Sequence, residues 1–132
     1  MNYLLDTHAF IWSISEKDKL STHVQAIMAQ SNNNFWVSKI SLLEIVIKKK
    51  TTRVEAFNIT FSELVASITS SGYLILDLKD NYLDAYTQID FHETHRDPFD
   101  RYLLSAALFE DFSIITKDEK FQLYKEPFRI VW

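Results

Sequence analysis

Short apolar runs alternate with amphipathic stretches along the whole chain. The apolar, β-rich runs predict strands at residues 2–6, 35–38, 73–78, 112–116 and 128–132. The stretches between them have helical spacing, with helices expected at 7–15, 21–30, 41–50, 60–71, 81–89 and 98–108 and a short one at 119–124. Strands separated by helices predict a mainly parallel sheet covered on both faces. We therefore expect a three-layer α/β/α fold in a single domain, residues 1–132.

The expected helix ends carry recognisable signals. Thr60 and Glu63 have the spacing of a capping box, and Ser41 and Glu44 repeat that spacing. Gly72, the only glycine, follows the helix expected at 60–71, where a C-cap favours glycine.

Composition narrows the class of protein. The 132 residues are 47% hydrophobic, which suits a domain with a real core, and the absence of cysteine excludes disulfides and thiolate metal sites. No apolar run reaches the length of a membrane span, so we expect a soluble, cytoplasmic protein. The net charge of −4 argues against coating nucleic acid by bulk charge, so any contact with nucleic acid must be local.

Acidic residues recur at one edge of the expected sheet. Asp6 closes the first strand and Asp118 follows the strand at 112–116, while Glu44 and Asp100 lie in the opening turns of helices. Ligands of such sheets bind beyond the carboxyl ends of the strands. The four carboxylates are therefore expected to converge there.

The stretch "HRDPFDRYLLSAAL" contains two aspartates with different predicted roles. Asp97, Pro98 and Asp100 fit the Ncap, N1 and N3 positions of a helix, so Asp97 has a capping role. Asp100 continues the apolar stripe of that helix, where a charge is costly unless it is paired or binds metal. Asp100 is therefore the better candidate for chemistry.

Each of the other acids also has a structural interpretation. Asp6 could cap the following helix, Glu44 could be the capping-box partner of Ser41, and Asp118 could be an ordinary turn and N-cap residue. Taken together, clustered carboxylates without cysteine form an oxygen-rich site suited to Mg²⁺ or Mn²⁺.

Four blocks in the same order resemble the PIN domains of VapC-type toxin ribonucleases: "LLDTHAFIW", "VSKISLLEIVIKK", "HRDPFDRYLLSAAL" and "IITKDEKFQLY". The resemblance implies a PIN-like fold and metal-dependent endonucleolytic cleavage of RNA, with Mg²⁺ or Mn²⁺ as cofactor. It places the acidic quartet on Asp6, Glu44, Asp100 and Asp118, with Thr116 in a supporting position. It also implies a small co-encoded antitoxin and a homodimer. Residues 51–72 lack the glycines often found there, and "IKKKTTR" is unusually basic.

Basic residues near these acids are candidates for RNA contact. Lys48 and Arg53 belong to one basic run, and Arg101 and Lys117 are each the sequence neighbour of an acid of the quartet. The alternative for the run at 48–50 is solvation and the helix dipole. His8 follows Asp6 closely and could reach the rim of the site, but surface or capping roles are expected for both His8 and His95.

Rival functions remain open at this point. A receiver-type phosphoacceptor domain also has an acidic Mg²⁺ site, but it needs an acidic pair after the first strand, whereas "NYLLD" continues with Thr-His. A dinucleotide-binding fold needs a glycine-rich first turn, which one glycine excludes. A PIN-type nuclease that acts on DNA or in RNA processing, without an antitoxin, is the nearer alternative.

Overall fold

The computed structural model describes residues 1–51 and 60–132. In this part of the chain a sheet of five parallel strands has the order β3-β2-β1-β4-β5. The strands are β1 (Asn2–Leu5), β2 (Asn34–Ser38), β3 (Leu74–Leu76), β4 (Ser113–Ile115) and β5 (Ile130–Val131). They lie where the apolar runs predicted them, although β3, β4 and β5 are shorter than those runs.

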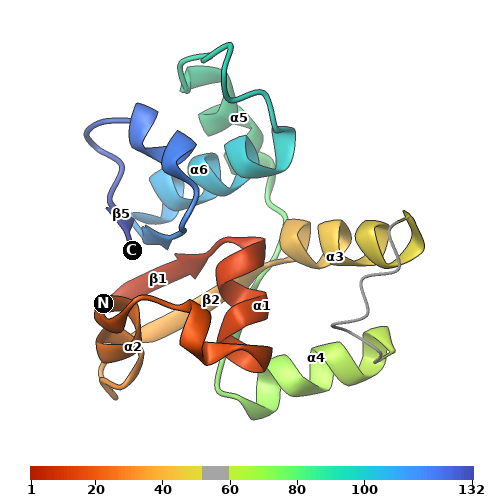
Figure 1. The fold of residues 1–132 in the computed structure, drawn as a ribbon. Helices are drawn as coiled ribbons and strands as arrows, with labels where there is room; N and C mark the ends of the chain where they lie inside the picture. The colour runs from red at the N-terminus through yellow and green to blue at the C-terminus, as the bar shows by residue number, and fades with distance from the viewer. Residues whose placement is uncertain (52–59) are drawn as a thin grey trace.

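Helices cover both faces of the sheet, which confirms the predicted three-layer arrangement (Figure 1). The α-helices are α1 (Thr7–Ser15), α2 (Thr22–Met28), α3 (Lys39–Thr51), α4 (Phe61–Ser70), α5 (Asp80–Gln88) and α6 (Pro98–Glu110). Short 3₁₀ helices are η1 (Lys17–Lys19) and η3 (Glu119–Leu123). In the described part of the chain, no helix is long and apolar enough to cross a membrane.

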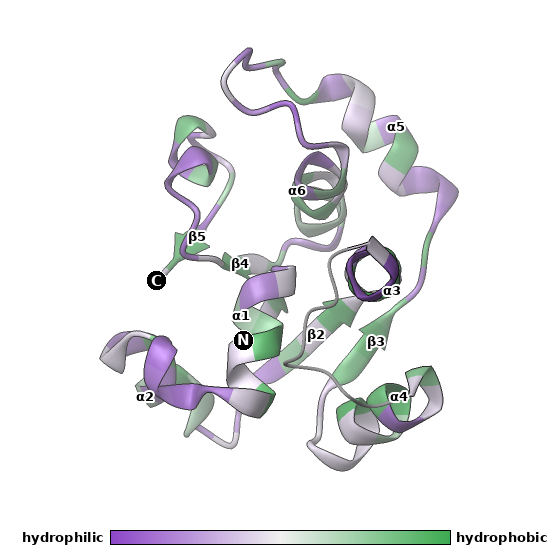
Figure 2. Cartoon of the chain, turned by 45° about the vertical axis from the view of Figure 1, so that its right-hand side comes forward, coloured by the Kyte–Doolittle hydropathy of each residue, from purple (hydrophilic) through white to green (hydrophobic). Residues whose placement is uncertain are grey.

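The period-2 alternation of β1 divides the core into two halves. Tyr3 and Leu5 pack with residues of α1, α2, α3 and α4, whereas Leu4 packs on the other face with α5, α6 and η3. Figure 2 shows hydrophobic residues in β3 and many hydrophilic residues in the loop from α5 to α6. Burial on both faces explains why the strands read as continuous apolar runs.

Two predicted helix signals are confirmed and one is wrong. Thr60 and Glu63 form a complete capping box, and Gly72 follows α4 with φ +80°, a conformation that glycine adopts without strain. Ser41 and Glu44 form no capping box, because α3 begins directly after β2 at Lys39 and Ser41 lies inside the helix.

The strand order reverses direction at β1. From β1 the chain adds β2 and β3 on one side, then returns to add β4 and β5 on the other. Asp6 follows β1 and Thr116 follows the neighbouring strand β4, so these residues lie at the same edge of the sheet, at the switch point. This switch point is where ligands of parallel α/β sheets bind.

Candidate active site

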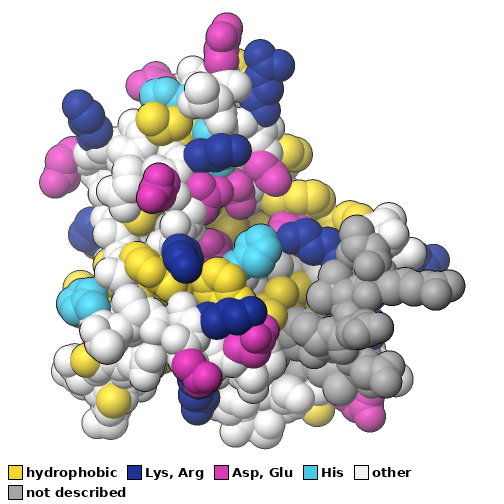
Figure 3. Space-filling model, in the orientation of Figure 1, with side chains coloured by type: hydrophobic (Ala, Val, Ile, Leu, Met, Phe, Trp, Pro, Cys, Tyr) yellow, Lys and Arg dark blue, Asp and Glu magenta, His cyan; other side chains and the backbone are white. Residues whose placement is uncertain are grey.

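A pocket of about 180 Å³ opens at this switch point. Figure 3 shows acidic side chains gathered in the middle of the visible face, with histidine and basic side chains at their border. The pocket is lined by Asp6, Thr7, His8, Glu44, Lys48, His95, Asp97, Asp100, Asp118 and Lys120. All four acids of the predicted quartet therefore share one pocket, although they come from four separate segments of the chain.

Asp6 is a helix cap and a pocket residue at once. It is 5% exposed, and its Oδ1 accepts the backbone N–H of Ala9 at 2.6 Å, which caps α1. The same side chain also lines the pocket. The two interpretations offered by the sequence therefore do not exclude each other.

Glu44 reaches the pocket from the second turn of α3. It is 9% exposed, and its Oε1 lies 3.3 Å from Nζ of Lys48, one turn further along the helix. The hydroxyl of Thr7 donates to Oε2 at 3.5 Å. A buried carboxylate with these partners points toward the end of β1, not back along its own helix as a cap partner would.

The start of α6 confirms the capping role predicted for Asp97 and places Asp100 in the pocket. Oδ1 of Asp97 accepts the N–H groups of Phe99 at 2.8 Å and Asp100 at 3.4 Å, so Asp97 is the N-cap and Pro98 is the first helical residue. Asp100 does not fold back on the cap. Its Oδ2 lies 3.0 Å from Nε2 of His95.

His95 was expected at the surface or in a capping role, and that prediction is wrong. The side chain is 1% exposed, and its ring packs against Phe121 and Tyr124. Nδ1 lies 3.1 Å from the hydroxyl of Tyr124. The one local signal was its position five residues before Asp100, whereas Tyr124 lies 29 residues further along the chain.

Asp118 closes the pocket from the loop after β4. Its Oδ1 accepts the N–H of Lys120 at 2.9 Å and thereby caps η3. Its own N–H donates to the hydroxyl of Thr116 at 3.0 Å. Thr116 is 2% exposed and its side chain also hydrogen-bonds with Asp6, so it links the ends of β1 and β4.

Burial and the neighbouring carboxylates raise the pKa values of two of the site acids, Asp6 and Asp100. Burial raises the pKa of Asp6, against the hydrogen bonds from Thr116 and Ala9, and the charge of Glu44 adds to the rise. Burial also raises the pKa of Asp100 to about 6; His95 opposes this change, while Asp97 and Asp6 reinforce it. The ionised cluster is thus unfavourable without a compensating cation.

The basic side chains predicted to contact RNA do not all lie in the acidic pocket. Lys48 lines the pocket, whereas Nζ of Lys117 lies 5.8 Å from the centre of the Trp12 ring. Arg53 lies outside the described residues. Lys120, which lines the pocket, was not singled out from the sequence.

Arg101 does not fit the phosphate contact predicted for it. Its guanidinium donates to the backbone oxygens of Ile89 and Asp90, at 3.1 and 2.9 Å, and stacks over Tyr86. Only 5% of the residue is exposed. The prediction is wrong because the packing of α5 against α6 buries this side chain.

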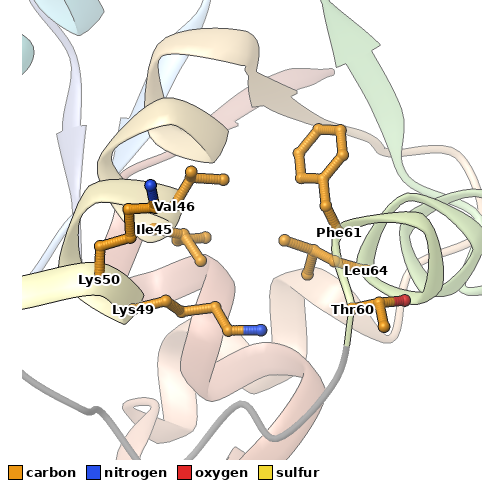
Figure 4. Close-up of a pocket in the computed structure, with 7 residues that line it drawn as sticks. All are labelled: Ile45, Val46, Lys49, Lys50, Thr60, Phe61 and Leu64. Carbon is orange, nitrogen blue, oxygen red and sulfur yellow. The ribbon is translucent and has the colours of Figure 1, made fainter.

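A second pocket of about 180 Å³ lies between α3 and α4 (Figure 4). Its lining is aliphatic and aromatic, with two lysines: Ile45, Val46, Lys49, Lys50, Thr60, Phe61 and Leu64. Among the described residues that line it, none carries a carboxylate or an imidazole. The four acids of the predicted quartet therefore line the acidic pocket and not this one.

The donor set of the acidic pocket fits a hard divalent cation. Carboxylate oxygens dominate it, and one potential ligand atom from each of His95, Asp100 and Asp118 lies within 4.8 Å of the others. Oxygen-rich sites of this kind suit Mg²⁺ or Mn²⁺. Asp6 and Glu44 add further carboxylate oxygens to the same pocket.

Comparison with known proteins decides the family. The PIN domain family model matches residues 3–127, nearly the whole chain. The chain belongs to the PIN-domain family. This membership removes the receiver-type alternative. The comparison with curated proteins gave no match.

Solved structures similar to this PIN domain share its fold over nearly the full length. VapBC2 from Rickettsia felis, bound to a DNA fragment from their promoter, has a TM-score of 0.70 and 19% identity, covering 100% of this chain and 99% of that one. DNA-bound VapBC from Salmonella typhimurium has a TM-score of 0.71 and 20% identity, covering 99% and 97%. Mycobacterium tuberculosis VapC20, described as a sarcin-ricin loop cleaving toxin, has a TM-score of 0.59 and 14% identity, covering 92% and 93%.

Proposed function

We propose that the protein is a Mg²⁺- or Mn²⁺-dependent endoribonuclease, the VapC-type toxin of a toxin–antitoxin pair. The observation that carries the proposal is the convergence of Asp6, Glu44, Asp100 and Asp118 on one pocket of a PIN domain. The similarity to structures of VapBC complexes and of an RNA-cleaving VapC supports the toxin assignment and RNA as substrate.

The acidic residues have a clear division of labour in this proposal. Asp6 and Asp118 each cap a helix through Oδ1, which fixes the carboxylate beside the pocket. Glu44 and Asp100 are held by Lys48 and His95. A divalent cation held by these groups would supply a nucleophilic water near neutral pH and offset charge on the phosphodiester.

Lysine side chains at the rim can supply the attraction for phosphate that the net charge of −4 does not. Lys48 and Lys120 line the same pocket as the acids. Contacts of this kind position the RNA backbone without reading its sequence. The proposal therefore places scissile phosphate between the acids and these lysines.

The antitoxin is proposed as the protein partner, together with a second copy of this chain as a homodimer. A carboxylate-rich pocket is complementary to an arginine or lysine side chain, which forms short, charge-assisted hydrogen bonds with carboxylates. We expect a C-terminal segment of the antitoxin to lie across the pocket and to present such a residue to Asp100 and its neighbours. Binding in that place would exclude RNA.

Cleavage of a labelled RNA by purified protein tests the activity. We expect cutting with Mg²⁺ or Mn²⁺, none with excess EDTA, and none with Asp6→Asn, while the matched control Asp84→Asn on the exposed side of α5 cuts like the wild type. Cutting that continues in excess EDTA would refute the metal mechanism. Cleavage of DNA but not RNA would favour the alternative without a toxin role.

Expression in cells tests the toxin assignment separately. We expect growth to slow when the wild type is expressed alone, to be unaffected by Asp6→Asn, and to recover when the neighbouring antitoxin gene is co-expressed. Normal growth in the presence of an enzyme that cuts RNA in vitro would remove the toxin assignment and leave the nuclease assignment standing.

A further inference from the structure

A chain of hydrogen bonds runs through the interior of the protein to the site carboxylate Asp100. It begins at the guanidinium of Arg101, whose Nη1 lies 3.4 Å from the hydroxyl of Tyr124. It continues from that hydroxyl to Nδ1 of His95, at 3.1 Å, and from Nε2 of His95 to Oδ2 of Asp100, at 3.0 Å. The proposed function uses only the last of these contacts, between His95 and Asp100, and gives no role to Tyr124 or Arg101.

The direction of donation along the chain follows from which atoms carry hydrogens. An arginine only donates, so the oxygen of Tyr124 accepts from Arg101. The hydroxyl hydrogen of Tyr124 then needs an acceptor, and in the described part of the chain the acceptor within hydrogen-bond distance is Nδ1 of His95. Nδ1 therefore has no hydrogen, and the hydrogen of the neutral ring is on Nε2, facing Asp100.

The same direction suits each end of the chain. The arginine end is anchored, because Nη1 and Nη2 also donate to the backbone oxygens of Asp90 and Ile89. The carboxylate end only accepts when it is ionised. If the ring had the opposite tautomer, the Tyr124 hydroxyl would have no acceptor and an unprotonated Nε2 would face the Asp100 carboxylate. A buried hydroxyl without an acceptor is unfavourable, and so are two buried acceptor atoms that face each other.

We propose that His95 is a positioning residue that holds Asp100 through an Nε2–H donor fixed by Tyr124 and Arg101, and is not itself a metal ligand. This inference rests on the proposed function in one respect, that Asp100 binds the metal. Holding Oδ2 fixes the plane of the carboxylate and the direction in which Oδ1 offers its lone pairs. Partners of this kind around a metal ligand tune metal affinity by about 10–100-fold.

The tautomer can be read directly from wild-type protein without metal. Long-range ¹H–¹⁵N NMR of the imidazole nitrogens distinguishes a protonated from an unprotonated Nε2. We expect His95 to be in the Nε2–H form in the wild type and to lose that preference in Tyr124→Phe, which keeps the ring and removes the hydroxyl. An Nδ1–H form in the wild type would overturn the proposal, whatever the protein does to RNA.

Two substitutions of His95 test the roles of its two ring nitrogens separately. Glutamine places its amide nitrogen about as far along the side chain as Nε2 and can still donate to Asp100, whereas asparagine reaches only as far as Nδ1. We expect His95→Gln to bind Mn²⁺ close to wild-type affinity and His95→Asn to bind about 10–100-fold more weakly by calorimetry. His92→Gln is the matched control, since His92 packs edge-on against the same Tyr124 ring.

The outcomes separate this proposal from the proposed function. Wild-type affinity in both His95 variants, or equal loss in both, would overturn the positioning role; equal loss is the result expected if the imidazole binds metal itself. A wild type that binds no Mn²⁺ would contradict the proposed function, and the NMR tautomer would then still decide the proposal. Circular dichroism of each variant identifies any loss that is due to unfolding.

Discussion

Replacing Asp100 by asparagine should make the metal-free protein more stable at neutral pH. The Asp100 side chain is only 23% exposed, and burial is the main reason that its pKa is raised to about 6. Asp97 and Asp6 contribute in the same direction, while the hydrogen bond with His95 opposes the rise. Asparagine has nearly the same shape and carries no charge, so it removes the unfavourable ionised form without opening a cavity.

The size of the effect follows from the difference between the two pKa values. The pKa of Asp100 rises from an ordinary value of 3.8 to about 6 in the folded state. Ionisation of Asp100 therefore lowers the free energy of unfolding by at most about 3 kcal/mol. The remaining exposure screens part of this cost, so we expect a gain of about 1–3 kcal/mol. For a chain of this size that corresponds to a rise in Tm of about 3–10 °C.

The sign of the pH dependence is equally specific. The folded state binds the Asp100 proton more tightly than the unfolded state does, so this group's contribution to stability is lost as the pH rises from about 4 through about 6. The wild type should therefore lose stability relative to Asp100→Asn over that range. Below it, both proteins have a neutral side chain at this position and should differ little.

The assay is thermal unfolding in EDTA, followed by circular dichroism between pH 4 and pH 8. Wild type, Asp100→Asn and the exposed control Asp84→Asn are compared at each pH. The control should follow the wild type. An Asp100→Asn variant that is less stable at pH 8, or whose difference from the wild type does not change with pH, would refute the reasoning about burial and charge crowding.

Three further predictions concern neighbouring residues. Asp97→Asn should remain stable and active because the amide oxygen can still cap α6, whereas Asp97→Ala should lose about 0.5–2 kcal/mol in urea unfolding; equal stability of the two would contradict the cap. Arg101→Ala should lose about 2–4 kcal/mol by the same measurement, because it leaves the carbonyls of Ile89 and Asp90 without a partner, and an unchanged stability would argue against its structural role. Lys48→Ala should weaken RNA binding and make the slope of the logarithm of the binding constant against the logarithm of salt concentration shallower by about 1, as expected for the loss of one phosphate contact. An unchanged slope would exclude that contact.

The order of strands and helices could be predicted from the sequence, because strands that are buried on both faces of a sheet consist of continuous runs of apolar residues. The grouping of the acidic quartet could be predicted from the sequence because Asp6 and Asp118 follow strands that end at the same edge of the sheet. Capping and ligand roles could not be separated locally. The structure shows why, since Asp6 and Asp118 each cap a helix through Oδ1 and also line the acidic pocket.

The missed features depend on contacts between distant segments. His95 lies in a polar loop, and nothing nearby in the sequence shows that Tyr124 and Phe121 bury its ring. Arg101 stands next to a site acid in the sequence, but the end of α5 covers it. The capping box expected at Ser41 was wrong because β2 passes into α3 without the intervening loop that such a cap requires.

The most direct test of the central claim is Mn²⁺ binding by metal-free protein, measured by calorimetry on the wild type and on a variant of each acid in the quartet. We predict that the wild type binds, that Asp84→Asn binds equally well, and that affinity falls at least about tenfold in every quartet variant, because each acid contributes oxygen and charge to one site. A wild type that does not bind, or a quartet variant that binds like the wild type, would contradict the claim of a single shared metal site. The variants are Asp6→Asn, Glu44→Gln, Asp100→Asn and Asp118→Asn.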